Sequence, residues 1–301
     1  MNKLICYKTM PTWDSNSLPT AFRKQHNTKV GTWAKLTILS GKLKYYAMDD
    51  SGKITDTFVF DNNSKIPFIE PQAWHKVEPL TNDLQCQLAF YCQPDDFYQK
   101  KYNLSATHSE VIETLQLMKS AGVNLEGVSA LDMGCGGGRN ALFLQRHGFD
   151  VTALDRNATA IDKLQTIIEQ ENLEHITAKV ANLHQVDELG LTEQYDLAIS
   201  TVVLMFLDAD KVPAVIDTMQ QHTKVGGYNL IVCAIDSEDY PYANYQGLLP
   251  FQFGLKTGEL SDYYQGWNIV KYNEDVGHLH RLDNEGNPIA LRFATLIAQK
   301  K

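Results

Sequence analysis

The 301-residue sequence lacks the cysteine pattern of a disulfide framework or a zinc site. Its five cysteines are odd in number and scattered along the chain, and no two of them are spaced as C-x-x-C. A disulfide-stapled domain or a structural zinc site needs paired or regularly spaced cysteines. We therefore expect a chain that folds around hydrophobic cores in a reducing compartment.

The sequence also lacks a long hydrophobic run. Apolar stretches such as Val202–Leu207 fall far below the roughly 20 residues that a membrane-spanning helix needs. The N-terminal segment MNKLICYKTMPTW contains no apolar core of the kind found in signal peptides. We expect a soluble, cytoplasmic protein that has no membrane partner.

Positive charge is scarce as well. The net charge of −9 opposes attraction to a polyanion, so a nucleic-acid partner is not expected. The charge is uneven along the chain, because residues 1–95 carry eleven Lys and Arg against nine Asp and Glu, whereas the remainder carries sixteen against twenty-seven. This change predicts two domains, residues 1–94 and residues 95–301. The oligomeric state cannot be read from the sequence.

The first segment is typical of β-structure. From Thr32 onward, β-branched and aromatic residues are interrupted about every ten residues by turn signals such as Ser40-Gly41. We expect a small all-β sandwich or barrel of cupin-like type. His75 could in principle bind a metal, but His26 is the only other histidine in this region. We therefore favour a structural His75 and predict no metal site.

The second segment switches to helical periodicity at residues 108–120 and then alternates between strands and helices. Such alternation builds a parallel sheet covered by helices on both faces, with ligands bound at the carboxyl ends of the strands. The predicted strands are residues 129–133, 149–155, 175–181, 195–201 and 228–234, and the predicted helices are residues 139–148, 158–170 and about 210–222.

The first strand ends in the glycine-rich stretch LDMGCGGGRN. A dinucleotide fingerprint G-x-G-x-x-G that starts at Gly134 and Gly136 fails at its third glycine, because that position is Arg139. The stretch instead matches the acidic-x-Gly-x-Gly loop of Rossmann-like methyltransferases, which bind S-adenosylmethionine. We expect both glycines to let the backbone approach the cofactor, since a Cβ would occupy that space. Asp132 is expected to organise the loop or to face the cofactor's ammonium.

The next strand ends extend this predicted site. Asp155 offers a carboxylate that can accept hydrogen bonds from both ribose hydroxyls, although it can alternatively cap the following helix, for which Asn157 is better placed. Asn182 can read the adenine edge, with the Leu183 backbone beside it. Val203, Leu204 and Phe206 are expected to be core residues. The remaining candidates for cofactor binding are Arg139, Asn140, Arg156 and Thr201.

Two absent motifs narrow the substrate. An N/D-P-P-Y/F run, typical of amino methyltransferases, does not follow the fourth strand, and the Pro-Cys pair of cytosine-C5 enzymes occurs nowhere. A small-molecule acceptor is therefore favoured. A small-metabolite methyltransferase, a sensor with a vestigial adenosyl pocket and a nicotinamide dehydrogenase remain the alternatives.

Several longer stretches, among them KKYNLSATHSEV, LDMGCGGGRN, VGGYNLIVCA and KYNEDVGHLHR, resemble the TehB tellurite methyltransferase family. The N-terminal segment is similar to the β domain of the long form of that family. The resemblance implies an α/β Rossmann-like class I methyltransferase domain preceded by a small all-β domain. It also implies S-adenosylmethionine-dependent methylation of tellurite, with selenite as a further substrate, for detoxification.

The resemblance further implies that His280 and Arg281 handle a small oxyanion substrate, for which cationic donors are suited. Arg292 is a further candidate cation. The family commonly has an Arg where this chain has Pro288, which cannot donate a hydrogen bond. Upstream, Tyr102 and His108 lie in a segment that acts as a cofactor lid in this enzyme class. Alternatively, Tyr102 is a partly buried aromatic residue, and His108 is a residue at the N-terminus of a helix.

Overall fold

The computed structural model describes residues 3–245, 247–249, 251 and 254–301, without the side chain of His280. The chain divides into two compact units, Met1–Leu104 and Ser105–Lys301. Each unit has its own hydrophobic core. The two units are therefore taken one at a time.

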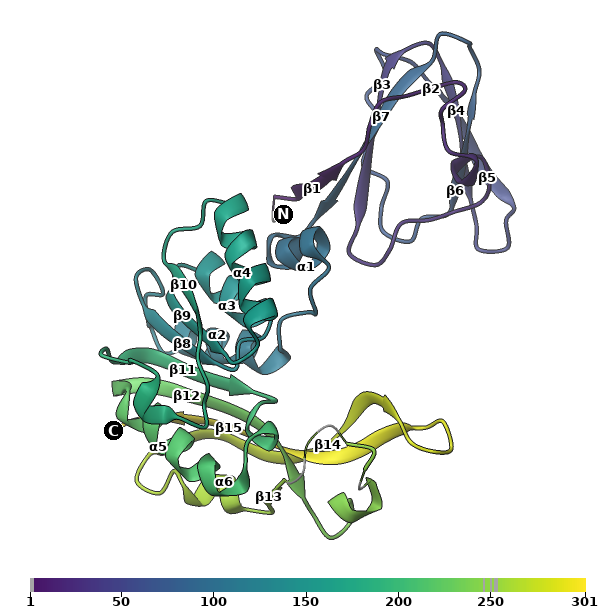
Figure 1. Ribbon diagram of the computed structural model, residues 1–301. Helices are drawn as coiled ribbons and strands as arrows, with labels where there is room; N and C mark the ends of the chain where they lie inside the picture. Colours follow the sequence, from purple (N-terminus) through teal and green to yellow (C-terminus); the bar gives the residue numbers. More distant parts are fainter. Residues whose placement is uncertain (1–2, 246, 250, 252–253) are drawn as a thin grey trace. The chain divides into compact units, whose positions relative to one another are not determined.

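The first unit consists of two antiparallel sheets (Figure 1). In one sheet β7 (Gln85–Cys92) pairs with β1 (Ile5–Thr9), β2 (Trp13–Asp14) and β3 (Trp33–Ser40); in the other, β4 (Leu43–Met48) lies between β5 (Ile54–Phe60) and β6 (His75–Pro79). Short helical segments are η1 (Thr20–Arg23), η2 (Pro94–Asp96) and α1 (Phe97–Tyr102). The predicted all-β character of this segment is confirmed.

Strand β3 shows why this segment forms sheets. Ala34, Leu36 and Ile38 are buried, whereas the residues between them are more exposed. Side chains of a strand alternate between its two faces, so this pattern gives β3 one apolar face. Leu36 and Ile38 pack there with the fully buried Leu43 and Leu84.

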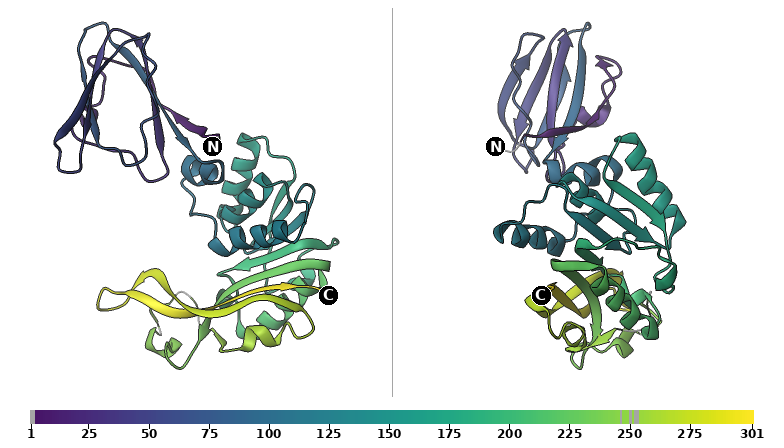
Figure 2. Two further views of the ribbon diagram at one scale, coloured as in Figure 1. Left: turned by 180° about the vertical axis from the view of Figure 1, so that it is seen from behind. Right: turned by 90° about the vertical axis from the view of Figure 1, so that its left-hand side faces the viewer.

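The second unit is built on one mixed sheet with the strand order β10-β9-β8-β11-β12-β15-β14 (Figures 1 and 2). Its parallel part comprises β8 (Ser129–Met133), β9 (Asp150–Asp155), β10 (Ile176–Val180), β11 (Tyr195–Thr201) and β12 (Thr223–Asp236), and the short β13 (Leu255–Lys256) pairs with β12. The helices are α2 (Ser109–Ser120), α3 (Arg139–Arg146), α4 (Ala158–Gln170), α5 (Val212–Gln221) and α6 (Glu259–Asp262), with the short η3 (Val186–Glu188), η4 (Leu204–Phe206), η5 (Ala209–Lys211) and η6 (Tyr242–Tyr245). The predicted Rossmann-like alternation of strands and helices is confirmed.

The C-terminal part adds a long hairpin that the sequence prediction did not include. Strand β15 (Pro288–Gln299) runs antiparallel to both β12 and β14 (Asn268–Leu282). The pairing of β12 with β15 ends at Ile235 and Arg292, whereas β14 and β15 remain paired out to Leu282 and Pro288. The hairpin therefore projects beyond the carboxyl edge of the parallel strands, as Figure 1 shows.

Alternation along β8 assigns its side chains to two environments. Leu131 and Met133 belong to the core cluster that also contains the buried face of α5 and Leu260 of α6. Asp132 lies between them in the strand, so its side chain points to the opposite face. This register places a buried carboxylate beside the start of the glycine-rich loop.

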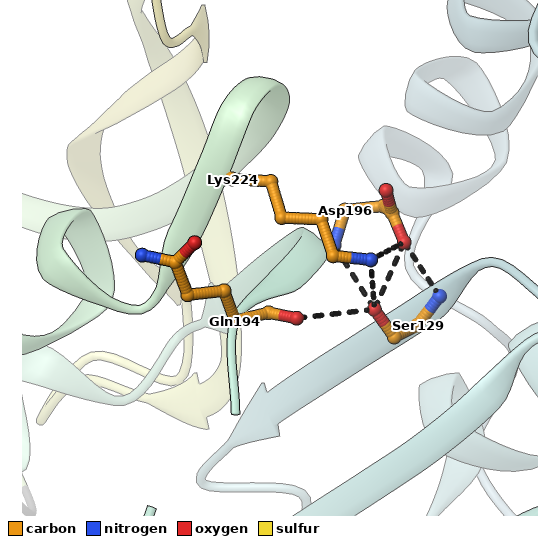
Figure 3. Close-up of polar contacts among 4 residues, drawn as sticks. All are labelled: Ser129, Gln194, Asp196 and Lys224. Carbon is orange, nitrogen blue, oxygen red and sulfur yellow. Dashed lines mark hydrogen bonds and ion pairs between the residues drawn. The ribbon is translucent and has the colours of Figure 1, made fainter. Parts of the chain in front are cut away.

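The opposite, amino edge of the sheet is joined by a polar network (Figure 3). The Asp196 carboxylate accepts hydrogen bonds from the Ser129 backbone and hydroxyl, both at 2.9 Å, and forms a 2.8 Å ion pair with Lys224. The Ser129 hydroxyl also lies 3.4 Å from the carbonyl oxygen of Gln194. These contacts tie β8, β11 and β12 together away from the glycine-rich loop.

Helix α2 is tied to the C-terminal hairpin by charge. The Lys271 ammonium on β14 lies 2.7 Å from the carboxylates of both Glu110 and Glu113 on α2. These ion pairs fix the start of α2, which borders the candidate site.

None of the described helices is both long enough and apolar enough to cross a bilayer.

Candidate cofactor and substrate site

A cavity of about 370 Å³ lies where β8 and β11 end. The chain leaves β8 toward β9 on one side, whereas β11 lies on the other side, so this is the topological switch point where open α/β sheets bind ligands. The lining residues are Gly134, Asp155, Arg156, Asn157, Leu183, Val202, Val203, Phe206 and Leu207. The cavity thus combines one carboxylate and one cation with an apolar wall.

Asp155 shapes the loop that borders the cavity. Its Oδ2 accepts a hydrogen bond from the backbone N–H of Gly136 at 2.8 Å, and its Oδ1 accepts one from the N–H of Asn157 at 2.8 Å. The side chain of Asn157 caps α4 by accepting a hydrogen bond from the Ala160 N–H. The prediction that Asn157 is the helix cap is confirmed, and the Asp155 carboxylate remains on the cavity wall.

Gly134 lines the cavity, and the packing of the loop gives a further reason for a glycine at this position. Its φ of +86° is strained for residues with a side chain, and a Cβ there would lie 2.4 Å from a methyl of Val203. The close packing of Val203 therefore occupies the space at Gly134. At Gly136, in contrast, a Cβ would meet nothing within 4 Å, so this glycine leaves an open approach along the loop.

Val202 adopts an unusual backbone conformation directly after β11. Its φ is +60°, a value that costs about 1–3 kcal/mol for a residue with a side chain and is rare for β-branched residues. Its N–H nevertheless donates a 2.7 Å hydrogen bond to the carbonyl oxygen of Val232. The turn at Val202 directs the chain so that Val202 and Val203 both line the cavity.

Two residues expected to be plain core belong to the cavity wall instead. Leu204 is fully buried, as predicted, but Val203 and Phe206 line the cavity, and Phe206 remains 38% exposed. The ring of Phe206 makes an edge contact with Phe251, with 5.6 Å between their centroids. An apolar run after a strand cannot by itself distinguish core from the wall of a ligand cavity.

Asp132 has a buried carboxylate whose desolvation is not fully offset by hydrogen bonds. It is 1% exposed, and its Oδ2 has no hydrogen-bond partner among the residues that the structure describes. Burial raises the pKa of Asp132 to about 7, an effect that the nearby Arg139 guanidinium partly opposes. A buried polar atom without a partner is rare in proteins, so this oxygen marks a place where a cationic or hydrogen-donating ligand group would be stabilised.

Asn140 joins three segments around the loop. Its side-chain carbonyl accepts a 3.0 Å hydrogen bond from the His108 N–H, and its amide donates a 2.9 Å hydrogen bond to the hydroxyl of Thr201. Asn140 and Thr201 are both buried. These contacts make Asn140 a positioning residue that holds α3, the start of α2 and the end of β11 together.

His108 caps α2, because its Nδ1 accepts a hydrogen bond from the Glu110 N–H at 3.2 Å. The sequence analysis gave this helix-terminal role as the alternative to cofactor binding by His108. Burial, together with the positive charge of Arg139, lowers the pKa of His108 to about 4. The imidazole is therefore neutral at physiological pH.

Arg139 reaches from α3 toward the segment that precedes α2. One guanidinium nitrogen donates a 3.3 Å hydrogen bond to the carbonyl oxygen of Ala106. Burial lowers the pKa of Arg139, whereas Asp132 opposes that shift. Arg139 thus brings a partly buried positive charge close to Asp132 and His108.

Of the predicted adenine-reading pair, only Leu183 lines the cavity. The side chain of Asn182 is exposed, and its oxygen lies 3.2 Å from the His184 backbone nitrogen and 3.1 Å from the His184 Nδ1. Leu183, in contrast, is 5% exposed and packs in the core beneath the cavity.

The predicted substrate cations lie on the C-terminal hairpin. His280 belongs to β14, but its side chain lies outside the described residues. Arg281 is exposed near the hairpin end and makes no side-chain hydrogen bond or ion pair with the described residues. Arg292 is engaged with Asp239, to which it donates hydrogen bonds of 2.6 to 3.0 Å, and with the carbonyl oxygen of Glu274. Arg292 is therefore not free to bind an oxyanion.

Tyr102 ends α1 in the first unit, where the ammonium of Lys101 lies 5.6 Å from its ring centroid. His108 follows it by only six positions but belongs to the second unit.

Among the described residues, no three His, Cys, Asp or Glu side chains gather as a metal site would require.

Comparison with known proteins identifies the family of the chain. A family model described as "Tellurite resistance protein TehB" matches residues 90–297, and one described as "TehB-like domain" matches residues 8–88. The chain belongs to the TehB family. The resemblance seen in the sequence is thereby confirmed.

Members of the TehB family match along the whole chain. The protein named "Probable S-adenosyl-L-methionine-dependent methyltransferase TehB" of Haemophilus influenzae is 46% identical over 300 residues, which are 100% of this chain and 99% of that protein. The crystal structure of TehB from Haemophilus influenzae superimposes with a TM-score of 0.87 at 45% identity, covering 100% of this chain and 99% of that one. "Hemagglutinin 1" of Eikenella corrodens is 38% identical over 255 residues, 85% of this chain and 80% of that protein.

Membership in the TehB family confirms the predicted enzyme class, a methyltransferase that depends on S-adenosylmethionine. The residues of this chain fit such a cofactor. Asp155 offers an acceptor for hydroxyls, the open side of Gly136 leaves room along the loop, and the unpartnered Oδ2 of Asp132 suits an ammonium. The apolar wall around Phe206 suits a flat heterocycle.

Proposed function

We propose that this member of the TehB family methylates tellurite, and also selenite, with S-adenosylmethionine as the methyl donor. The observation that carries the proposal is the relationship to the TehB family over the full chain, whose model bears the description "Tellurite resistance protein". The absence of the amino- and cytosine-methyltransferase motifs is consistent with a small inorganic acceptor.

The cofactor residues act in two groups in this proposal. Asp155 accepts hydrogen bonds from the ribose hydroxyls, and Leu183 and Phe206 contact the adenine through the apolar wall. The methionine end lies toward Asp132, whose unpartnered oxygen faces the ammonium, and toward Arg139, whose guanidinium pairs with the carboxylate. Gly134, Gly136, Asn140 and Thr201 set the shape of the loop, with Arg156 at the open side of the cavity.

The substrate is held by cations of the hairpin. Arg281 is an exposed cation without an ion-pair partner in the described part of the chain, whereas Arg292 is held by Asp239. Arg281 is therefore the arginine of the hairpin that is available to an oxyanion, and His280 precedes it in β14. A planar guanidinium can bind two oxygens of one anion, which suits an oxyanion such as tellurite.

The chemistry makes limited demands on the protein. The bound cofactor supplies an electrophilic methyl group, and a chalcogen(IV) oxyanion attacks through its own lone pair. The protein must orient the anion and exclude water, so a strong general base is unnecessary. The neutral state of His108, whose pKa is lowered to about 4, agrees with a role in shaping the site.

Mass spectrometry with a thiol reductant present tests this proposal directly. Attack through the chalcogen(IV) lone pair oxidises the chalcogen as the methyl group is transferred, so a volatile product also requires reduction. Purified protein, S-adenosylmethionine and tellurite should yield S-adenosylhomocysteine and a methylated tellurium oxyanion in solution, excess glutathione should convert the latter to volatile methylated tellurium in the headspace, and selenite should yield the selenium analogues. His280→Ala and Arg281→Ala should lower turnover while S-adenosylmethionine affinity, measured by calorimetry, stays nearly unchanged. Arg281→Lys should recover only part of the loss, because an ammonium lacks the planar two-donor fork.

His278→Ala is the matched control, because His278 is an exposed histidine of the same strand. It should leave turnover unchanged. Full turnover in both the His280 and Arg281 variants would remove the hairpin from the substrate site. A protein that binds S-adenosylmethionine but methylates neither oxyanion would favour a small-metabolite acceptor instead.

A further inference from the structure

The first unit contains a cavity of about 480 Å³ that the methyltransferase chemistry does not use. All of its lining residues belong to residues 7–104. Its buried residues include Thr28, Thr32, Ala34 and His75, each less than 9% exposed. A cavity of this size can hold a small organic molecule.

Two histidines stand side by side in this cavity. His26 and His75 exchange backbone hydrogen bonds of 3.0 and 2.9 Å, and their ring centroids are 4.1 Å apart. The ring of His26 also stacks on Phe22, and that of His75 stacks on Tyr45. The pair is therefore fixed in place by the backbone and by its aromatic neighbours.

The hydrogen bonds of the two rings define their tautomers. Nδ1 of His26 lies 2.9 Å from the carbonyl oxygen of Lys24, and Nδ1 of His75 lies 2.8 Å from that of Ala73. A carbonyl oxygen only accepts hydrogen bonds, so each Nδ1 carries the proton. Burial lowers the pKa of both histidines, that of His75 to about 4. Each neutral ring therefore has an acceptor lone pair on Nε2, which makes no hydrogen bond with the described residues.

The charges around the cavity are positive. Lys8 and Lys29 line it, are exposed, and form no ion pair with any described residue. Lys100 also lines it, but its ammonium donates to the carbonyl oxygen of Val30 and interacts with Asp96. No Asp or Glu is among the described lining residues. In a protein of net charge −9, this is a local site of positive potential.

We propose that this cavity binds a small organic anion that has a flat apolar body and a hydroxyl donor. The anionic group lies toward Lys8 and Lys29, and the flat body packs against Phe22 and Phe90. The hydroxyl donates a hydrogen bond to Nε2 of the paired histidines. The first unit thus contains a second ligand-binding site, separate from the adenosyl cavity.

A metal ion fits the same cavity less well. Paired Nε2 lone pairs can ligate a divalent cation, but structural and catalytic zinc sites use at least three protein ligands. No third His, Cys, Asp or Glu joins the pair among the described residues. The two lysines would also repel a cation, whereas they attract an anion.

Calorimetry of the full chain with 4-hydroxybenzoate tests the proposal, because this probe carries a carboxylate, a ring and a hydroxyl. We expect one-to-one binding. The double variant Lys8→Gln/Lys29→Gln should weaken it about tenfold through the loss of charge attraction. Lys53→Gln/Lys65→Gln, which removes two exposed lysines of the same unit outside the cavity, should leave it unchanged.

The histidine contribution is measured with 4-methoxybenzoate, which lacks the donor. The parent should prefer 4-hydroxybenzoate by about tenfold, as expected for one hydrogen bond to a buried acceptor. The double variant His26→Phe/His75→Phe should keep both rings and lose the preference, with S-adenosylmethionine affinity reporting that the second unit remains folded. Absence of binding, or equal affinity in the double lysine variant and its control, would overturn the proposal. So would tight Zn²⁺ binding that His26→Phe abolishes in a protein that ignores 4-hydroxybenzoate.

Discussion

The amide of Asn140 donates a hydrogen bond to the hydroxyl of Thr201 over 2.9 Å, although the two residues are 61 positions apart. The same amide group accepts from the His108 N–H. One buried side chain thus couples the helix after the glycine-rich loop to the end of β11 and to the start of α2. The shape of the candidate site depends on this coupling.

Asn140→Ala should destabilise the fold and weaken S-adenosylmethionine binding. It leaves the His108 N–H and the Thr201 hydroxyl without their partner, which costs about 1–3 kcal/mol. Calorimetric melting should therefore shift down by several degrees. In a double-mutant cycle with Thr201→Val, the two losses should not add. Strict additivity would show that the hydrogen bond contributes nothing.

Asp132 should make stability depend on pH. Because burial raises its pKa from 3.8 in the unfolded chain to about 7, the folded state binds more protons between these values, and stability falls as the pH rises through that window. Asp132→Asn removes this cost. The variant should melt higher than the parent at pH 8, with a smaller difference at pH 5. A difference that does not vary with pH would contradict the raised pKa.

Asp132→Asn should also impair cofactor binding, because the proposed ammonium partner loses its negative charge. In the parent, S-adenosylmethionine affinity should fall as the pH drops below about 7, where Asp132 takes up a proton. Calorimetric titrations between pH 5 and 8 measure both effects. An affinity that is equal in parent and variant at pH 8 would remove Asp132 from the cofactor site.

Asp155→Ala tests the proposed ribose contact. Loss of hydrogen bonds to a carboxylate costs roughly 1.5–3 kcal/mol, so S-adenosylmethionine affinity should fall by about one to two decades. The melting temperature should also fall by a few degrees, because the backbone N–H groups of Gly136 and Asn157 lose their acceptor, although Asn157 continues to cap α4. Asp162→Ala, an exposed position on α4, is the matched control. Unchanged affinity in the Asp155 variant would refute the contact.

Pro288→Arg should restore the cation that the family commonly has. Pro288 is exposed at the first position of β15, opposite the exposed Leu282, so a longer side chain can extend toward solvent. The KM for tellurite should fall, and Pro288→Gln should show no such effect. A larger improvement in the Gln variant would assign the change to the backbone instead of the charge.

Truncation tests the predicted domain boundary and the role of Tyr102 together. A chain of residues 94–301 should fold and bind S-adenosylmethionine, because every other proposed cofactor contact lies beyond residue 104. If Tyr102 contacts the cofactor, residues 105–301 should bind more weakly than residues 94–301. Equal affinities would assign Tyr102 to the first unit alone. Failure of the fragment of residues 94–301 to fold would show that the first unit is needed for the stability of the second.

The sequence by itself determined the elements of the second unit and their order. Short apolar runs placed β8 and β11, and helical periodicity placed α4, each at its observed bounds, since these patterns are local properties of the chain. N-cap preference assigned the cap of α4 to Asn157, and the end of the second predicted strand placed Asp155 at the candidate site. Long shared stretches also determined the family, before any contact was known.

Only the tertiary structure decided which side chains meet. Val203 fills the space at Gly134, Asp239 engages Arg292, and His26 lies against His75. The antiparallel pairing of β14 with β15 and of β15 with β12 likewise joins distant segments. Their sequence patterns did not predict this pairing. Local periodicity records whether a residue is buried. The identity of its partner depends on how distant segments pack, and packing is a property of the whole unit.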